Sequence, residues 1–185
     1  MINCKIIKST PFGRVGVIWN EINCNPVITR ILIPKPGCSA VVQLSKRYRY
    51  WQEYSCAQID SIAYAIVAYL EGEKIEFSLD IVDLSLCTEF QRSVLRAGHR
   101  IPRGGVSTYR LIAQYIGKRN AARAVGNALA NNPFPLIVPC HRAVRSDLHL
   151  GGYQGGVEMK RDLLEREGIS FDDSGRVSSK QCYYD

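Results

Sequence analysis

Residues 107–130 read STYRLIAQYIGKRNAARAVGNALA, and this stretch decides the fold of the second half of the chain. Apolar residues recur at helical spacing from Ser107 or Thr108 onward and again from Ala121, which predicts two short helices. Residues 117–120 (GKRN) are expected to form the tight turn between them. Two short helices joined by such a turn are typical of a helix-turn-helix. The expected buried positions are Leu111, Ile112, Tyr115 and Ile116 in the first helix and Val125, Ala128 and Leu129 in the second.

A third helix is expected just upstream of this pair. Thr88-Glu-Phe-Gln91 has the capping-box pattern, and Val94 and Leu95 follow at helical spacing. Pro102 and the pair Gly104-Gly105 end the helix. The second half of the chain is therefore expected to be mainly helical.

The first half has a mixed pattern. Residues 11–19 and 28–33 are rich in β-branched and apolar residues and predict strands. A helical period runs from Asp60, and Gly72 is placed to stop it. Residues 75–84 (IEFSLDIVDL) alternate as a strand does. The first half therefore predicts an α/β domain.

The domain boundary is expected near residues 80–88. We accordingly divide the chain into an N-terminal α/β domain over 1–84, a second domain over 85–170 and a C-terminal tail over 171–185. The sequence of the tail, which ends in Cys-Tyr-Tyr-Asp, indicates no role.

The positive charge of the chain lies in its second half. The net charge is +7, from 24 Lys and Arg against 17 Asp and Glu, and residues 88–185 carry a net +6 of it. Residues 92–145 contain ten Lys or Arg and no acid. Such a stretch suits a surface that meets polyphosphate, because an acid there would repel the partner. The alternative is a basic surface with no partner, and composition alone does not decide between them.

Composition excludes several classes of protein. With 46% hydrophobic and 22% charged residues the chain is ordinary globular material. No apolar run approaches the roughly 20 residues of a membrane span, and the N-terminus lacks a signal-peptide core, so we expect a cytoplasmic protein without a membrane partner. The seven cysteines form no CxxC pair and predict no disulfide framework. The three histidines all lie in the second half, so we expect no metal site and no cofactor.

The second helix of the pair has an unusual composition. Ala121, Ala122 and Ala124 surround Arg123, so one long cation stands among short side chains. A helix that approaches a DNA groove closely needs such short side chains. An Ala-rich helix can also reflect helix propensity alone. The acid-free stretch around it favours DNA contact.

A candidate nucleophile lies within residues 132–144 (NPFPLIVPCHRAV). The apolar run ends at Pro139, so Cys140 lies where a buried segment enters a turn. His141 and Arg142 give this cysteine an electropositive setting, which favours the thiolate. The thiolate is the nucleophilic form, so Cys140 is a candidate for covalent catalysis.

Pro139-Cys140-His141-Arg142 resembles the active-site motif of the O6-alkylguanine-DNA alkyltransferases, also called methylated-DNA–protein-cysteine methyltransferases. The resemblance continues in order over residues 88–168, whereas the first 80 residues resemble the family only loosely. The further matching segments are Phe90-Gln91, Ile101-Pro102, Ala121 to Gly126, Asn132-Pro133, and Gly152-Tyr153 through Glu167-Gly168.

The resemblance implies a DNA-repair protein that reacts once. Its N-terminal domain is expected to hold an RNase H-like sheet, and its C-terminal domain a helix-turn-helix. The expected partner is double-stranded DNA that bears O6-alkylguanine, or also O4-alkylthymine. The alkyl group is expected to pass irreversibly to Cys140, in a monomer that needs no cofactor.

The resemblance also implies residue roles in DNA binding. Arg123 is expected to fill the base stack after the damaged nucleotide flips out, at a cost of a few kcal/mol. Ala121 and Ala122 are expected to permit close approach. Tyr109 is expected to rotate the nucleotide and to give a proton to the guanine leaving group.

The remaining implied roles concern chemistry and the pocket. His141 is expected to take the proton of Cys140 through a water, with Glu167 orienting the imidazole. Asn132 is expected to tie the active-site turn to the helix-turn-helix. The expected pocket residues are Pro135, Tyr153, Gln154 and Gly155.

One position departs from the family pattern. Gln154 stands where many members carry Ser, and its backbone N–H can still reach O6. Gly155 and Gly156 leave that wall of the pocket without bulk, which predicts tolerance of adducts larger than methyl.

Three other classes of protein compete with this interpretation. Alkyltransferase-like proteins bind DNA and flip the base but lack the reactive cysteine, and the presence of Cys140 argues against them. A plain helix-turn-helix regulator leaves the Pro-Cys-His-Arg segment unexplained. A thiol hydrolase has only Cys140 and His141 in its support.

Overall fold

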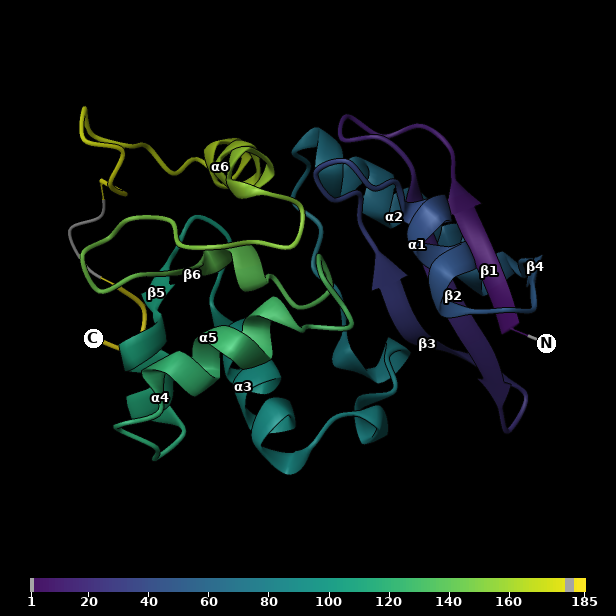
Figure 1. Ribbon diagram of the computed structural model, residues 1–185, viewed down its shortest axis with the longest axis horizontal. Helices are drawn as coiled ribbons and strands as arrows, with labels where there is room; N and C mark the ends of the chain where they lie inside the picture. Colours follow the sequence, from purple (N-terminus) through teal and green to yellow (C-terminus); the bar gives the residue numbers. More distant parts are fainter. Residues whose placement is uncertain (1, 179–181) are drawn as a thin grey trace. The chain divides into compact units, whose positions relative to one another are not determined.

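The computed structural model describes residues 2–178 and 182–185. The chain forms two compact units: residues 1–86 with Pro133–Ile137, and Cys87–Asn132 with Val138–Asp185. The first unit combines a sheet with helices, and the second is mainly helical (Figure 1). The coarse prediction of an α/β first half and a helical second half is confirmed.

A four-stranded sheet forms the centre of the first unit. Its strands are β1 (Ile2–Ile7), β2 (Val15–Ile22), β3 (Asn25–Leu32) and β4 (Trp51–Glu53), in the order β3-β2-β1-β4. The pairs β1–β2 and β2–β3 are antiparallel, and β4 lies parallel to β1. The apolar segment that starts β2 is buried over five consecutive residues, as expected of a strand covered on both faces.

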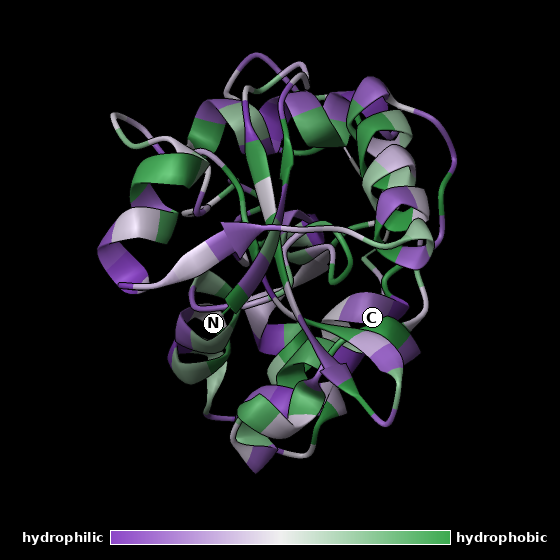
Figure 2. Cartoon of the chain, turned by 90° about the vertical axis from the view of Figure 1, so that its right-hand side faces the viewer, coloured by the Kyte–Doolittle hydropathy of each residue, from purple (hydrophilic) through white to green (hydrophobic). Residues whose placement is uncertain are grey.

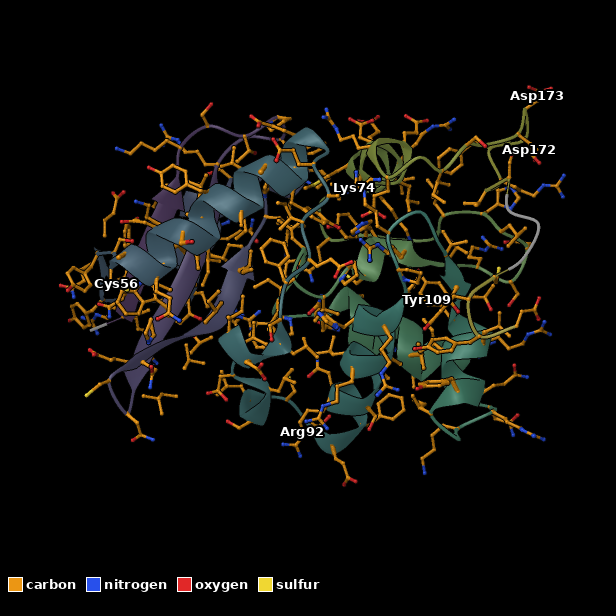
Figure 3. The ribbon with its side chains drawn as sticks, turned by 180° about the vertical axis from the view of Figure 1, so that it is seen from behind. Cys56, Lys74, Arg92, Tyr109, Asp172 and Asp173 are labelled. Carbon is orange, nitrogen blue, oxygen red and sulfur yellow. The ribbon has the colours of Figure 1, made fainter. Side chains whose placement is uncertain are left out.

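One helix lies on each face of this sheet (Figures 1 and 3). Helix α1 (Ala40–Arg47) places Leu44 in an apolar cluster on one face. Helix α2 (Ala57–Glu71) lies on the other face, where Lys5 of β1 pairs with its Asp60 at 2.6 Å. Successive side chains of a strand alternate between faces, so the two helices together bury both sides of β1. The cluster under α1 consists of Cys4, Ile6, Ile18, Leu32, Ala40 and Leu44.

The expected strand over residues 75–84 is wrong. Single-turn 3-10 helices form at Leu79–Ile81 and Leu84–Leu86, and Val82 alone makes a bridge, to Ile28. Side chains near these turns bond to local backbone: the hydroxyl of Ser78 accepts from the N–H of Asp80 at 3.1 Å. Such local bonds compete with a strand ladder, although the apolar alternation is present.

The other strands and the helix of the first unit follow the sequence pattern with shifted ends. The strands expected at 11–19 and 28–33 run over 15–22 and 25–32, and α2 begins three residues before Asp60 and ends before Gly72, which adopts a left-handed φ of 104°. The pattern did not reveal β1, β4 or α1.

The second unit contains four helices among its described residues (Figure 1). Along the helices of the chain as a whole, hydrophilic and hydrophobic residues alternate (Figure 2), as expected where each helix buries one face. A short parallel pair, β5 with β6, lies beside them. The elements are α3 (Glu89–Arg100), β5 (Ser107–Thr108), α4 (Tyr109–Tyr115), α5 (Ala122–Ala130), β6 (Ala143–Val144) and α6 (Val157–Arg166).

The start of α3 gives a stability test. The hydroxyl of Thr88 caps this helix by accepting a hydrogen bond from the N–H of Gln91 at 3.2 Å. We expect Thr88→Ala to lower the free energy of unfolding by about 1 kcal/mol, measured by urea denaturation. Thr88→Ser keeps the oxygen and should lose much less. Equal losses in the two variants would show that the cap contributes nothing.

Candidate active site

Strand pairing brings the candidate nucleophile close to the start of α4. Cys140–Arg142 form a single 3-10 turn, η3, and β6 follows at once. Strand β6 pairs in parallel with β5, which leads directly into Tyr109 (Figure 3). Cys140 is 5% exposed. The chain therefore places a buried thiol near the phenol of Tyr109, and the Cys140 charge contributes to the pKa of Tyr109.

A buried carboxylate organises the residues after Cys140. Glu167, which ends α6, lies 3.0 Å from Nε2 of His141 through its Oε1. Arg142 donates to both oxygens of this carboxylate, from Nε and from Nη2, each at 2.8 Å. Its Nη1 donates to the carbonyl of Ile101 at 2.6 Å, at the end of α3. This bidentate arrangement is the strong form of an Arg–carboxylate pair.

These contacts fix the protonation of Glu167 and His141. Burial raises the pKa of Glu167, but hydrogen bonds and charge from His141 and Arg142 outweigh it and hold the pKa well below its usual range. Burial lowers the pKa of His141, and Glu167 opposes this only in part. At neutral pH an ionised carboxylate therefore faces a neutral imidazole. Since the carboxylate only accepts, Nε2 of His141 carries the proton and Nδ1 keeps a basic lone pair.

The pKa of Cys140 is set by burial, and not by His141 and Arg142 as the sequence suggested. Burial raises the pKa of the Cys140 thiol. A hydrogen bond from the Asn132 side chain and the charge of Lys160 both lower this pKa, but their effect is smaller than that of burial. Arg142, expected to favour the thiolate, directs its guanidinium to Glu167. The expectation that His141 and Arg142 favour the Cys140 thiolate is therefore wrong, because burial dominates. The resting residue is a thiol that needs a base.

Lys160 of α6 is a site residue that the sequence reasoning missed. Its side chain is fully buried, and Nζ donates to the carbonyls of Ala143, at 2.6 Å, and Leu150. Nζ lies 5.9 Å from the centre of the Tyr109 ring. Burial lowers the pKa of Lys160 to about 8, and the Cys140 charge raises it. Lys160 therefore supplies the cationic charge that acts on Cys140.

The sequence did contain a signal for Lys160. It lies on the apolar stripe of α6, between Met159 and Leu163, where a solvated lysine is not expected. A lysine on a buried helix face needs polar partners, because burying an unpaired charge is costly.

Tyr109 lies against a loop that a side chain would obstruct. A Cβ added to Gly151, whose φ is +68°, would lie 2.9 Å from the hydroxyl of Tyr109. Burial, followed by the Cys140 charge, raises the pKa of Tyr109 to about 12. Tyr109 is thus a protonated phenol at neutral pH.

Three of the expected pocket residues lie in the same unit as Cys140 and His141. The ring of Tyr153 meets that of His141 edge-on, with centroids 6.2 Å apart. The side chain of Gln154 donates to the carbonyl of Asn132 at 2.7 Å. A Cβ on Gly155 would overlap the sulfur of Met159. The space beside Gly155 is therefore filled by Met159, contrary to the expectation of a wall without bulk.

Asn132 occupies the position expected of a connecting residue. It is 1% exposed, and its side-chain Nδ2 donates to the carbonyl of Val138 at 3.0 Å. The main chain of Asn132 meanwhile accepts from Gln154. It thus joins the end of the α5 segment to the segment before Cys140.

The remaining expected residues lie elsewhere. Pro135 is buried within the first unit. Ala121 caps α5 without a side-chain hydrogen bond, Ala122 begins the helix, and Arg123 is exposed. Among the described residues no ion pair involves Arg123. Its guanidinium is therefore available at the start of α5.

Residues 2–178 and 182–185 lack two features that mark other classes of protein. They contain no cluster of His, Cys, Asp or Glu that could hold a metal ion. None of their helices is long and apolar enough to cross a membrane.

Comparison with known proteins assigns the chain to a class. Residues 89–169 match the model of the 6-O-methylguanine DNA methyltransferase DNA-binding domain. The methylated-DNA–protein-cysteine methyltransferase of Methanothermobacter thermautotrophicus is 37% identical over 163 residues, covering 88% of this chain and 84% of that protein. The enzyme of the same name from Sulfurisphaera tokodaii is 42% identical, with coverages of 88% and 92%.

A solved structure supports the same assignment. The crystal structure of Mycobacterium tuberculosis OGT in complex with DNA is similar with a TM-score of 0.69 and 32% identity, covering 89% of this chain and 92% of that chain. Fold and comparisons thus define a DNA-binding methyltransferase with a buried cysteine at its candidate site. The chain belongs to the methylated-DNA–protein-cysteine methyltransferase family.

The charge of Lys160 gives a test by pH. Because its ammonium favours the Cys140 anion, Lys160→Met should raise the pKa of the thiol. The thiolate fraction at neutral pH falls about tenfold for each unit of that rise. We expect slower alkylation of Cys140 by iodoacetamide, with its pH profile shifted upward, measured by mass analysis of the Cys140 peptide.

Lys118→Met is the matched control, since Lys118 is exposed in the turn before α5. An unshifted pH profile in Lys160→Met would show that this charge does not act on Cys140.

Proposed function

We propose that this protein repairs DNA by transferring the alkyl group from O6 of guanine to Sγ of Cys140, once per molecule. The observation that carries this proposal is the chain of contacts from Glu167 to His141 beside the buried thiol. An ionised carboxylate that orients a neutral imidazole is the arrangement that prepares a base for a nucleophile. Family membership supports the same activity.

The reaction follows from these protonation states. Nδ1 of His141 accepts the thiol proton, through a water, and the imidazolium that forms is stabilised by Glu167. The Sγ–C bond forms as the C–O6 bond breaks, and the electron pair stays on guanine. Tyr109 gives guanine a proton and regains one from the solvent or from His141. The pKa of about 12 keeps Tyr109 protonated and able to donate. The thioether product has no leaving group that restores the thiol.

The DNA surface is proposed on the second unit. Helices α4 and α5, joined by the turn at Gly117, would act as a helix-turn-helix. Arg123 at the start of α5 would fill the stack left by the flipped base, and Ala121 and Ala122 would allow the backbone close approach. The acid-free stretch over residues 92–145 supports phosphate contact around this helix pair.

The other parts of the proposal concern organisation. We propose residues 1–84 as an RNase H-like domain, which the order β3-β2-β1-β4 with β4 parallel to β1 supports. Residues 85–170 would form the catalytic domain, with Tyr153, Gln154 and Gly155 near the alkyl group. We propose that the protein acts as a cytoplasmic monomer and also accepts O4-alkylthymine. Because Met159 fills the space beside Gly155, tolerance of large adducts depends on movement of that side chain.

The activity is tested with a duplex that contains one O6-methylguanine. We expect the Cys140 peptide to gain one methyl group, with at most one methyl per protein and none in Cys140→Ala. Binding of the duplex with Cys140 unmodified at excess lesion would contradict the proposal and would favour an alkyltransferase-like binding protein.

The role of Arg123 is tested by changing the cost of base flipping. A finger that fills the stack matters only where the base is stacked in a duplex. We expect Arg123→Ala to slow methyl transfer about tenfold or more from duplex DNA, and much less from a single-stranded oligonucleotide. Arg14→Ala, a change at an exposed arginine of the first unit, is the control. Equal slowing on both substrates would contradict the role.

A further inference from the structure

Residues near the C-terminal end of the chain lie against the second unit, beyond the segment matched by the family domain model. The N–H of Tyr183 donates to the carbonyl of Val106 at 2.8 Å, and the hydroxyl of Ser107 donates to the carbonyl of Tyr183 at 2.6 Å. Cys182 packs against the apolar cluster that contains Val106 and Leu164. This segment is therefore docked by both backbone and side-chain contacts beside β5.

Tyr184 connects two helices of the unit. Its ring stacks on that of Tyr115, the last residue of α4, with centroids 3.9 Å apart and an interplanar angle of 21°. Its hydroxyl donates to the carbonyl of Ala97 in α3 at 2.9 Å. Arg100 of α3 also donates to the Tyr115 hydroxyl and lies 5.9 Å from that ring. Two contacts therefore connect Tyr115 to α3: one through Tyr184 and one directly from Arg100.

The bond to Ala97 falls at a place where α3 offers an acceptor. The last four carbonyls of a helix lack a partner within the helix. The N–H of Ile101, which would otherwise bond to Ala97, donates to Gly98 at 3.3 Å. The hydroxyl of Tyr184 satisfies the carbonyl that remains, so the docking geometry is specific.

Helix α4 depends on such contacts for its position. It has only seven residues, and isolated helices of this length are not stable in water. Its last residue, Tyr115, leads through the turn at Gly117 into α5 and Arg123. Whatever fixes the C-terminal end of α4 therefore also sets the direction from which α5 starts.

We propose that Tyr184 is a positioning residue for DNA recognition: by clamping the end of α4 to α3, it orients α5 and Arg123 toward the duplex. This inference rests on the proposed DNA-binding role of α4 and α5. It gives the C-terminal segment a role in substrate binding, distinct from the chemistry at Cys140.

The test compares Tyr184→Ala and Tyr184→Phe with Tyr64→Ala, a change at a 77% exposed tyrosine of the first unit. Binding of a fluorescent lesion-free duplex is measured by anisotropy, at a temperature where circular dichroism shows every variant folded. Reaction of Cys140 with iodoacetamide reports the active site without DNA. If DNA binding must restore the arrangement that the stacked pair holds in the unmodified chain, Tyr184→Ala should weaken duplex binding by up to about five-fold. The iodoacetamide reaction should not change.

Tyr184→Phe keeps the stacked ring but loses the bond to Ala97, so its duplex binding should fall between that of Tyr184→Ala and that of the unmodified chain. Tyr64→Ala should match the unmodified chain. Unchanged duplex binding in Tyr184→Ala would overturn the inference. Parallel loss of duplex binding and of Cys140 reactivity would overturn it as well, since that result indicates a general structural role. Failure of the unmodified chain to take up methyl from the lesion would count against the proposed function, and the lesion-free binding measurement is independent of that outcome.

Discussion

The structure of the second unit depends on one buried negative charge, the Glu167 carboxylate. The Glu167 side chain is 2% exposed. Its charge is stable in the interior because Arg142 donates one hydrogen bond to each carboxylate oxygen, and His141 contacts Oε1 as well. Arg142 also reaches the end of α3 through Ile101. One ion pair thus joins α3, the active-site turn and the end of α6. Removing one partner of a buried ion pair typically lowers the free energy of unfolding by about 3–5 kcal/mol.

The same charge assigns the chemical roles around it. The guanidinium of Arg142 is directed to Glu167, and burial raises the pKa of Cys140, which rests as a thiol. The imidazole of His141 stays neutral, with its proton directed at the carboxylate. Lys160 adds a cationic charge near the thiol but does not outweigh burial. A buried thiol beside an oriented imidazole suits the single transfer proposed for this protein.

The sequence predicted those features that depend on local pattern. The capping box at Thr88 and the apolar spacing in residues 107–130 predicted α3, α4 and α5, because these helices bury one face each. The prediction that Tyr115 is buried was wrong, since this side chain at the end of α4 is 45% exposed. The Cys140–His141 motif marked the buried turn η3, at which Glu167 contacts His141. The wrong strand at 75–84 had the right alternation, but alternation cannot show that local hydrogen bonds from Ser78 and its neighbours replace the ladder.

The features that sequence could not reveal arise from long-range contacts. Tyr184 meets Ala97 and Tyr115 only in the folded unit, and nothing in its neighbourhood marks it. The charge state of Cys140 likewise depends on burial, which adjacent residues do not report. Lys160 is intermediate, since its place on an apolar stripe was visible but its two carbonyl partners were not.

The protonation of His141 is the most direct test of whether this residue is the base for Cys140. Nitrogen NMR of the imidazole, recorded as a function of pH in the unmodified chain, distinguishes the two tautomers and the charged form. We expect a neutral ring that carries its proton on Nε2 at neutral pH and titrates below the ordinary value of 6.5. An imidazole that titrates at or above that value, or carries its proton on Nδ1, would contradict the assignment of His141 as the base for Cys140.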